Sequence, residues 1–160
     1  MSDDDYTWMF RQEYPAVVRT VTMIVRDRGR AEEITQDAFI QMFTHWRRVS
    51  RYERPEAWVR RVAIRIAVRQ ARREEARPRL EFQAGVTPIE REPDIDLQRA
   101  IASLPTAQRA AVALFYLDDL PIDEIARAMG SSRSAVKVNL HRARHRLAEL
   151  LGEEVSDDVG

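Results

Sequence analysis

Hydrophobic residues recur three and four positions apart along most of this 160-residue chain, and this spacing is the period of an α-helix. Within residues 6–75 the pattern predicts three or four helices, including one over 31–46 and one over 55–73. The same period returns over about 95–151. No stretch alternates between apolar and polar residues for long enough to build a sheet, so the pattern predicts an all-α fold.

The helical pattern is interrupted in the middle of the chain. Residues 76–95 contain three prolines and one glycine and show no sustained period, which is typical of an extended linker. We therefore predict two small helical domains, 1–75 and 96–151, joined by a flexible acidic linker over 76–95. Residues 152–160 are polar and acidic, so we expect them to form a frayed tail.

Residues 121–147 of the second domain indicate two helices joined by a tight turn. The first helix opens at Pro121, where a missing N–H costs nothing, and stops at Gly130. Either Ser131 or Ser132 can cap the second helix. This arrangement is typical of a helix-turn-helix motif that binds DNA.

The second of these helices is strongly cationic. Between Gly130 and Arg146 there are five formal cations and no anion, which suits a helix lying against phosphates. We expect the phosphate contacts to come from Arg133, Lys137 and Arg144, and the base contacts from Ser134, Val138, His141 and Arg142. Val138 points away from the apolar face of the helix, so its side chain can press on a thymine methyl group in the major groove.

The helix predicted from Pro55 carries a second row of cations. Its core stripe is predicted to comprise Trp58, Val62 and Ile66 with the adjacent Val59, Ala63 and Ala67. The arginine ridge, defined as Arg61, Arg65, Arg69 and Arg72, repeats at near-helical spacing on another face. In the preceding loop, Arg51 and Tyr52 suit a nucleic-acid backbone and a stacked base, although packing within the loop is the alternative for Tyr52. These residues predict a second nucleic-acid surface.

The formal net charge is zero, but the charges are segregated along the chain. Residues 45–73 hold ten arginines against two glutamates, whereas residues 74–96 hold seven acids against three arginines. With no cysteine, the chain has no disulfides and no cysteine-based zinc site. It also shows no signal peptide and no apolar run of membrane length, so we expect a cytoplasmic protein that does not insert into membranes.

An enzyme is the first alternative function. His141 and His145 stand four residues apart, a spacing that can place two imidazoles on one metal ion. No third ligand lies nearby in the sequence, and the surrounding residues are cationic and would repel a metal. Because no nucleophile and base suggest themselves either, we expect no catalytic site, no metal and no cofactor.

Four segments together carry a family resemblance. AEEITQDAFIQMFTHW, RPEAWVRRVAIRIAVRQARR, LPTAQRAAVALFYLDDLPIDEIARAMG and SSRSAVKVNLHRARHRL occur in this order, with the acidic linker after the second. This arrangement closely resembles the bacterial sigma-70 family, in its short extracytoplasmic-function form. The resemblance implies that residues 1–75 bind core RNA polymerase and open the −10 promoter element, and that residues 96–151 read the −35 element.

The resemblance also implies partners and contact residues. The partners are core RNA polymerase, promoter DNA and an anti-sigma factor. Glu33, Gln36 and Asp37 match positions that contact the polymerase clamp helices, and the alternative is that they are only the solvent-facing side of an amphipathic helix. Arg65 occupies the position where many relatives carry an asparagine that reads a −10 base, so the −10 preference stays open. Val138 and Asn139 likewise depart from the usual polar and cationic pattern.

The second alternative function is a helix-turn-helix repressor or activator whose N-terminal helices form a sensor or dimerisation module. The arginine ridge argues against this class, because a sensing domain needs no second nucleic-acid surface.

Overall fold

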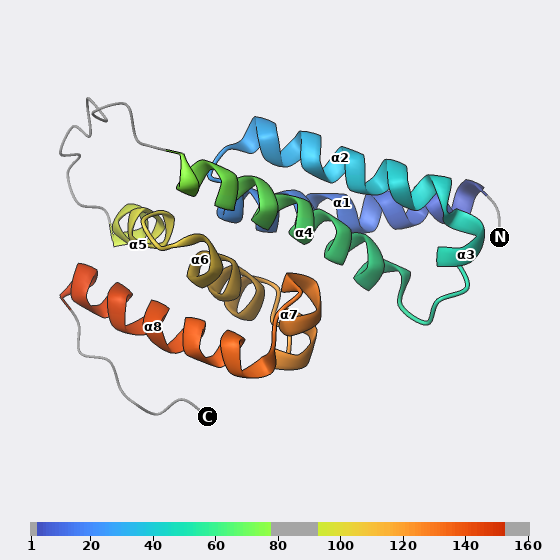
Figure 1. Ribbon diagram of the computed structural model, residues 1–160. Helices are drawn as coiled ribbons and strands as arrows, with labels where there is room; N and C mark the ends of the chain where they lie inside the picture. The colour runs from blue at the N-terminus through green and yellow to red at the C-terminus, as the bar shows by residue number, and fades with distance from the viewer. Residues whose placement is uncertain (1–2, 78–92, 153–160) are drawn as a thin grey trace.

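The computed structural model describes residues 3–77 and 93–152, and Figure 1 shows them as two groups of helices in contact along α4. The elements are α1 (Asp3–Val25), α2 (Arg28–Thr44), α3 (Trp46–Val49), α4 (Pro55–Ala76), α5 (Pro93–Ala102), α6 (Thr106–Val112), the π-helical turn η1 (Ala113–Leu117), α7 (Ile122–Met129) and α8 (Arg133–Leu151). The described residues include no strand, and the all-α fold with two helical regions is confirmed. Most of the predicted linker and tail lies outside the described residues, and α5 begins within the range predicted as linker.

Three long helices, α1, α2 and α4, form the N-terminal region. α2 begins after Asp27, whose side chain accepts a hydrogen bond from the Arg30 N–H at 3.0 Å and caps the helix. The Tyr6 hydroxyl donates to the Phe39 carbonyl at 2.7 Å, and the Tyr6 ring meets the Phe43 ring edge-on with centroids 5.1 Å apart. These contacts fix the direction in which the exposed face of α2 points.

The helix-turn-helix forms as its sequence predicts. α7 ends at Gly130, which adopts the left-handed conformation with φ 64° that glycine accepts without strain. Of the two candidate caps, Ser132 is the one used, since its side chain accepts a hydrogen bond from the Ala135 N–H at 3.1 Å. Val136, Leu140 and Ala143 bury the inner face of α8.

The buried face of α4 differs in part from the predicted stripe. Val59, Ala63 and Ala67 are fully buried as expected, whereas Trp58, Val62 and Ile66 are only half-buried. The buried face extends instead through Ile64, Val68 and Ala71. The reason is that α4 has neighbours on two sides, with α1 and α2 on one and α6 and α7 on the other (Figure 1).

The two helical regions share one continuous hydrophobic core. Buried residues of α1, α2 and α4 belong to the same cluster as those of α6, α7 and α8. A region of this size buries only a modest fraction of its surface by itself, so packing the two regions together removes more apolar area from water. The sequence pattern indicates the two regions but not this contact.

The most deeply buried charge lies at the seam between the regions. The Arg109 side chain of α6 is 2% exposed and donates from Nε to the Ile24 carbonyl at 2.8 Å and from Nη1 to the Leu104 carbonyl. Ile24 lies in the last turn of α1, where carbonyls lack partners within the helix and a positive charge is favourable. Burial lowers the pKa of Arg109 to about 10, so the guanidinium stays charged at neutral pH.

Other polar contacts cross the same seam. The Thr20 hydroxyl of α1 donates to Asp118 Oδ1 at 2.7 Å, just after η1. Arg26 Nη1 donates to the Ala102 carbonyl at 2.9 Å, although this pair is exposed. Together with Arg109, these contacts set the position of the C-terminal region against α1.

We predict that Arg109→Ala lowers the free energy of unfolding by about 3 kcal/mol, because it removes two charge-assisted hydrogen bonds and leaves buried carbonyls unpaired. Chemical denaturation of the full chain measures the change. The control is Arg99→Ala on the exposed side of α5, which should change stability by less than about 0.5 kcal/mol. Equal losses in the two variants would contradict a special role for Arg109.

A second prediction concerns Asp118. Burial raises the pKa of its carboxyl, so ionised Asp118 destabilises the fold at pH values above that raised pKa. Asp118→Asn keeps an oxygen that can accept from Thr20 and removes the buried charge. The variant should therefore match or exceed the native chain in stability at about pH 7, and this advantage should vanish by about pH 3, where Asp118 is protonated in both states. Urea unfolding of both chains at several pH values measures whether the stability difference depends on pH in this direction.

Candidate nucleic-acid interface

The outer face of α8 brings most of the predicted DNA-contacting residues together. Arg133, Ser134, Lys137, Val138, His141 and Arg142 are all exposed. Arg133 forms an ion pair with Asp123 at 2.9 Å, and both partners are exposed, so the pair contributes little stability. The Arg133 side chain can therefore leave Asp123 and bind a phosphate instead. The opposite face of α8 is held by the core, which leaves this side free to enter a groove.

Arg144, which the sequence predicts to contact a phosphate, is less exposed than the other predicted residues of α8. Its side chain is half-buried and donates from Nε to the Tyr116 hydroxyl at 2.5 Å. Its guanidinium carbon also lies 5.5 Å from the ring centroids of Phe115 and Tyr116. These aromatic rings belong to η1, so tertiary packing directs the Arg144 side chain toward the protein, and its phosphate contact stays a prediction.

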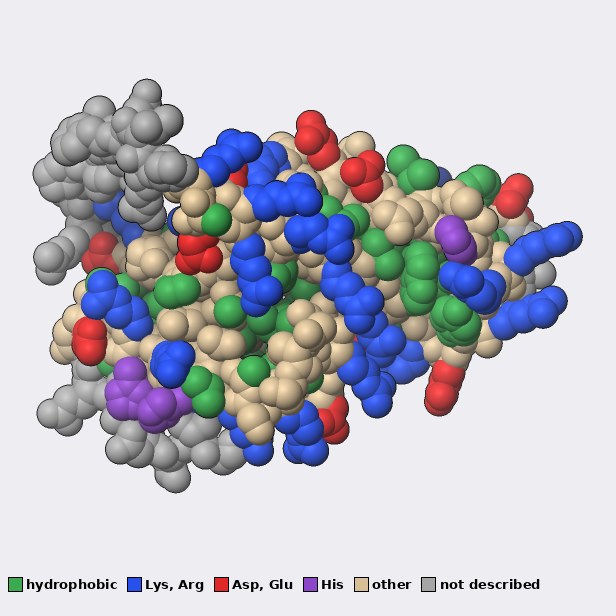
Figure 2. All heavy atoms as spheres, viewed as in Figure 1, with side chains coloured by type: hydrophobic (Ala, Val, Ile, Leu, Met, Phe, Trp, Pro, Cys, Tyr) green, Lys and Arg blue, Asp and Glu red, His purple; other side chains and the backbone are tan. Residues whose placement is uncertain are grey.

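His141 and His145 lie side by side on α8, with ring centroids 4.3 Å apart. Figure 2 shows the pair on the surface of the C-terminal region, close to cationic side chains. The described residues contain no group of three histidine, cysteine or acidic side chains that could hold a metal ion.

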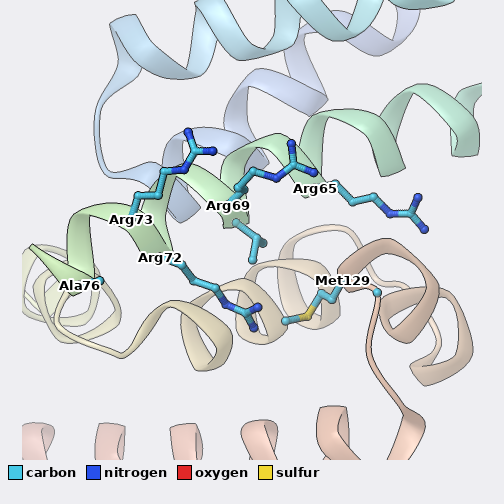
Figure 3. Close-up of a pocket in the computed structure, with 8 residues that line it drawn as sticks. Arg65, Arg69, Arg72, Arg73, Ala76 and Met129 are labelled. Carbon is cyan, nitrogen blue, oxygen red and sulfur yellow. The ribbon is translucent and has the colours of Figure 1, made fainter.

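The arginine ridge of α4 divides into two parts. Arg65, Arg69 and Arg72 are exposed, and Figure 2 shows Lys and Arg side chains forming a band across this face. With Arg73 they surround an open cavity of about 470 Å³ whose lining includes Val68 and, from the other region, Met129 and Gly130 (Figure 3). The side chains of Arg69, Arg72 and Arg73 make no hydrogen bond or ion pair within the described part of the chain.

Arg61 is not exposed like the rest of the ridge. Its guanidinium donates from Nε and Nη2 to the two carboxylate oxygens of Glu124 in α7, at 3.0 and 3.1 Å. These hydrogen bonds lower the pKa of Glu124. Arg65 also reaches α7, since its Nη2 donates to the Arg127 carbonyl at 3.0 Å. Nothing local in the sequence pointed to Glu124, because its partner lies 63 residues away.

The loop after α3 presents the other predicted −10 residues. Arg51 and Tyr52 are exposed and, with Arg47 and Arg48, line an open hollow of about 710 Å³. The Tyr52 ring does not belong to the core cluster, so it is available for stacking. The nucleic-acid role of Tyr52 stays a prediction, with packing within the loop as its alternative.

The predicted polymerase-contacting residues lie on the exposed face of α2. Glu33, Gln36 and Asp37 are all exposed. Two apolar side chains continue this face, Ile40 at 62% exposure and Phe43 at 55%. Exposed apolar side chains beside polar ones are typical of a protein-binding surface, and the sequence analysis had missed both of them. Their spacing four and seven residues after Gln36 could have revealed them.

Two family models match the chain. The model of Sigma-70 region 2 covers residues 9–77, and the model of Sigma-70, region 4, covers residues 94–147. The ECF RNA polymerase sigma factor SigM of Mycobacterium tuberculosis is 31% identical over 150 aligned residues, and the match covers 90% of this chain and 76% of that protein. The chain belongs to the extracytoplasmic-function (ECF) group of the sigma-70 family.

Other relatives agree with this assignment. The ECF RNA polymerase sigma factor SigE of Mycolicibacterium smegmatis is 28% identical over 166 residues, and the match covers 93% of this chain but only 62% of that protein. The fold is similar to that of the sigma factor RpoE of Bartonella quintana, solved in complex with the anti-sigma factor NepR. That comparison has a TM-score of 0.73 at 18% identity and covers 94% of this chain and 99% of the other.

Membership of this family confirms the predicted class of function. A sigma factor is the promoter-recognition subunit of RNA polymerase, so the repressor alternative is not favoured. Sigma factors are transcription regulators, which is consistent with the expectation that this chain is not an enzyme. None of the helices that the structure describes combines the length and the apolar character needed to span a bilayer.

We predict that Val138→Ala in this sigma factor alters sequence preference more than general DNA affinity, because the lost contact is with a base edge and not with a phosphate. Losing one methyl contact should cost about 1 kcal/mol on the preferred site. Binding to a preferred and an unrelated duplex is measured at one salt concentration. Equal losses on the two duplexes would show that Val138 does not read sequence.

Proposed function

We propose that this sigma factor binds core RNA polymerase through α2 and directs initiation by holding the −10 element with α4 and the −35 element with α8. The observation that carries the proposal is that one chain presents two separate cationic surfaces together with a third face of mixed polar and apolar character. A factor that only binds DNA needs no such third face.

The −35 element is assigned to the exposed face of α8. Arg133 and Lys137 suit phosphates, while Ser134, Val138 and Arg142 suit base edges. His141 lies on the same face and can donate to either. Arg144 is left out of this surface because it is directed at η1.

The −10 element is assigned to the exposed part of the arginine ridge and to the loop before α4. Arg65, Arg69 and Arg72 can follow the backbone of a separated strand, and Tyr52 with Arg51 can hold an extruded base. Since Arg65 replaces the usual asparagine, the base preference of relatives does not carry over to this chain. Selection of bound fragments from a mixture of promoter sequences would identify the preferred base.

Relatives support a proposal for regulation and location. RpoE of Bartonella quintana was solved with an anti-sigma factor, and we propose that a protein of this kind also binds the present chain. The site of action is the cytoplasm, where core RNA polymerase works, and the chain itself carries out no chemical step.

Transcription from a purified system tests the proposal. The full chain is mixed with core RNA polymerase and a library of promoter-containing templates, without any other initiation factor. We expect transcripts that start at defined positions. If the folded chain binds core polymerase but starts no transcript from any template, the proposed function is wrong.

The polymerase contact has its own prediction. Ile40→Asp should weaken binding to core RNA polymerase by about tenfold or more, since it places a charge in the centre of an apolar contact. Stability should hardly change, because the side chain is already exposed. Gln12→Asp, an exposed position on α1, serves as the matched control. Equal affinities for the two variants would show that core RNA polymerase does not bind this face of α2.

A further inference from the structure

Three cations lie along one flank of α8, between its buried face and its outer face. Arg133, Lys137 and Arg144 follow each other at intervals of four and seven residues, which places them on the same side of the helix. From residue 133 to residue 144 an α-helix rises about 16 Å, so this row is long enough to meet several phosphates of one DNA strand. The sequence predicts a phosphate contact at each of the three positions, and only the end at Arg144 is not fully exposed.

At the Arg144 end of this row, the side chain more open to solvent is that of Tyr116. Tyr116 is 56% exposed, whereas Arg144 is half-buried and its Nη1 is itself buried. The two side chains are joined by the hydrogen bond from Arg144 Nε to the Tyr116 hydroxyl, at 2.5 Å. An anion that approaches this end of the flank therefore has easier access to Tyr116 than to Arg144.

The fold fixes the Tyr116 ring in this position. Tyr116 belongs to η1, which continues α6, and α6 packs along α8 (Figure 1). The neighbouring Phe115 packs against the shared core and meets the Tyr116 ring edge-on, with centroids 4.8 Å apart. The Arg144 guanidinium carbon lies 5.5 Å from the centroid of the same ring. Because Phe115 and Arg144 both contact the ring before DNA is bound, a contact made by Tyr116 costs little side-chain entropy.

The Tyr116 hydroxyl has one hydrogen-bonding capacity left. A phenol oxygen can accept a hydrogen bond and can also donate its own proton. Here the oxygen accepts from the cationic Arg144, and within the described residues the hydroxyl donates to no other group. Accepting from a charged donor polarises the O–H bond and strengthens its own donation. The group that best fits this donor is an anionic oxygen, such as that of a DNA phosphate.

We propose that Tyr116 is a further DNA-contacting residue of the −35 surface: its hydroxyl donates to a backbone phosphate, and Arg144 is the positioning residue that holds the hydroxyl. The proposal rests on the assignment of the −35 element to α8. It extends the DNA-binding surface from α8 to η1. Because the contact is with a phosphate, it sets how α8 lies against the duplex and does not read the base sequence.

Tyr116→Phe tests the contact, because it removes the hydroxyl and keeps the ring beside Arg144. Binding of the full chain to a short duplex of mixed sequence is measured at several salt concentrations. We expect a loss of affinity of about tenfold, the effect of one hydrogen bond to a charged group. The salt dependence should match that of the parent, since a neutral hydroxyl releases no counterion. Stability should hardly change, because the side chain is exposed.

Two control variants accompany this measurement. Lys137→Ala removes a cation assigned to a phosphate, so it should weaken binding and reduce the salt slope by about 1. Tyr14→Phe removes a hydroxyl from α1 in the other region and should leave the affinity unchanged. If Lys137→Ala weakens binding and Tyr116→Phe does not, the proposal is wrong and the assignment of DNA to α8 stands. If neither weakens binding, both are wrong.

The positioning role of Arg144 is tested by combining two variants. If Arg144 acts through the hydroxyl, Arg144→Gln should cost several-fold less affinity in the Tyr116→Phe chain than in the parent. Losses that simply add would show that Arg144 contacts DNA by itself and would overturn its positioning role. Arg144→Lys, which keeps the charge without the guanidinium, replaces Arg144→Gln in this comparison if the latter does not fold. These measurements use neither polymerase nor promoter, so their outcome is separate from that of the transcription experiment.

Discussion

The buried guanidinium of Arg109 is the contact on which the arrangement of the two regions depends. A charge at 2% exposure is tolerated only because two carbonyls accept its hydrogen bonds, and one of them lies at the end of α1 in the other region. If the regions separate, Arg109 loses a partner but regains water. The contact therefore specifies one relative position of the two regions, while the apolar core that they share supplies the area buried between them.

The helix α4 connects this structural constraint to function. Its buried face is wide because it packs against both regions, and its exposed face is left to the arginines. Arg61 stands at the border between these faces, close enough to α7 to bind Glu124. In this arrangement Arg61 serves the packing of the two regions, whereas Arg69 and Arg72 stay exposed.

Arginines in this chain consequently have different roles according to burial. Arg109 and Arg144 are directed at carbonyls and aromatic rings and stabilise packing. Arg69 and Arg72 have open surroundings and suit DNA phosphates. The sequence shows all of these residues as similar cations at helical spacing, because a guanidinium has the same charge whatever its partner.

Much of the architecture follows from the sequence alone. Helical periodicity, Pro121, Gly130 and a serine cap determine α7 and α8, since these signals act within a few residues of each other. The exposed faces of α8 and α2 follow from the same periodicity. The pairing of Arg61 with Glu124, the inward turn of Arg144 and the burial of Arg109 were decided only by tertiary structure. Each joins residues of different helices, and no periodic pattern within one helix encodes which neighbour will pack against it.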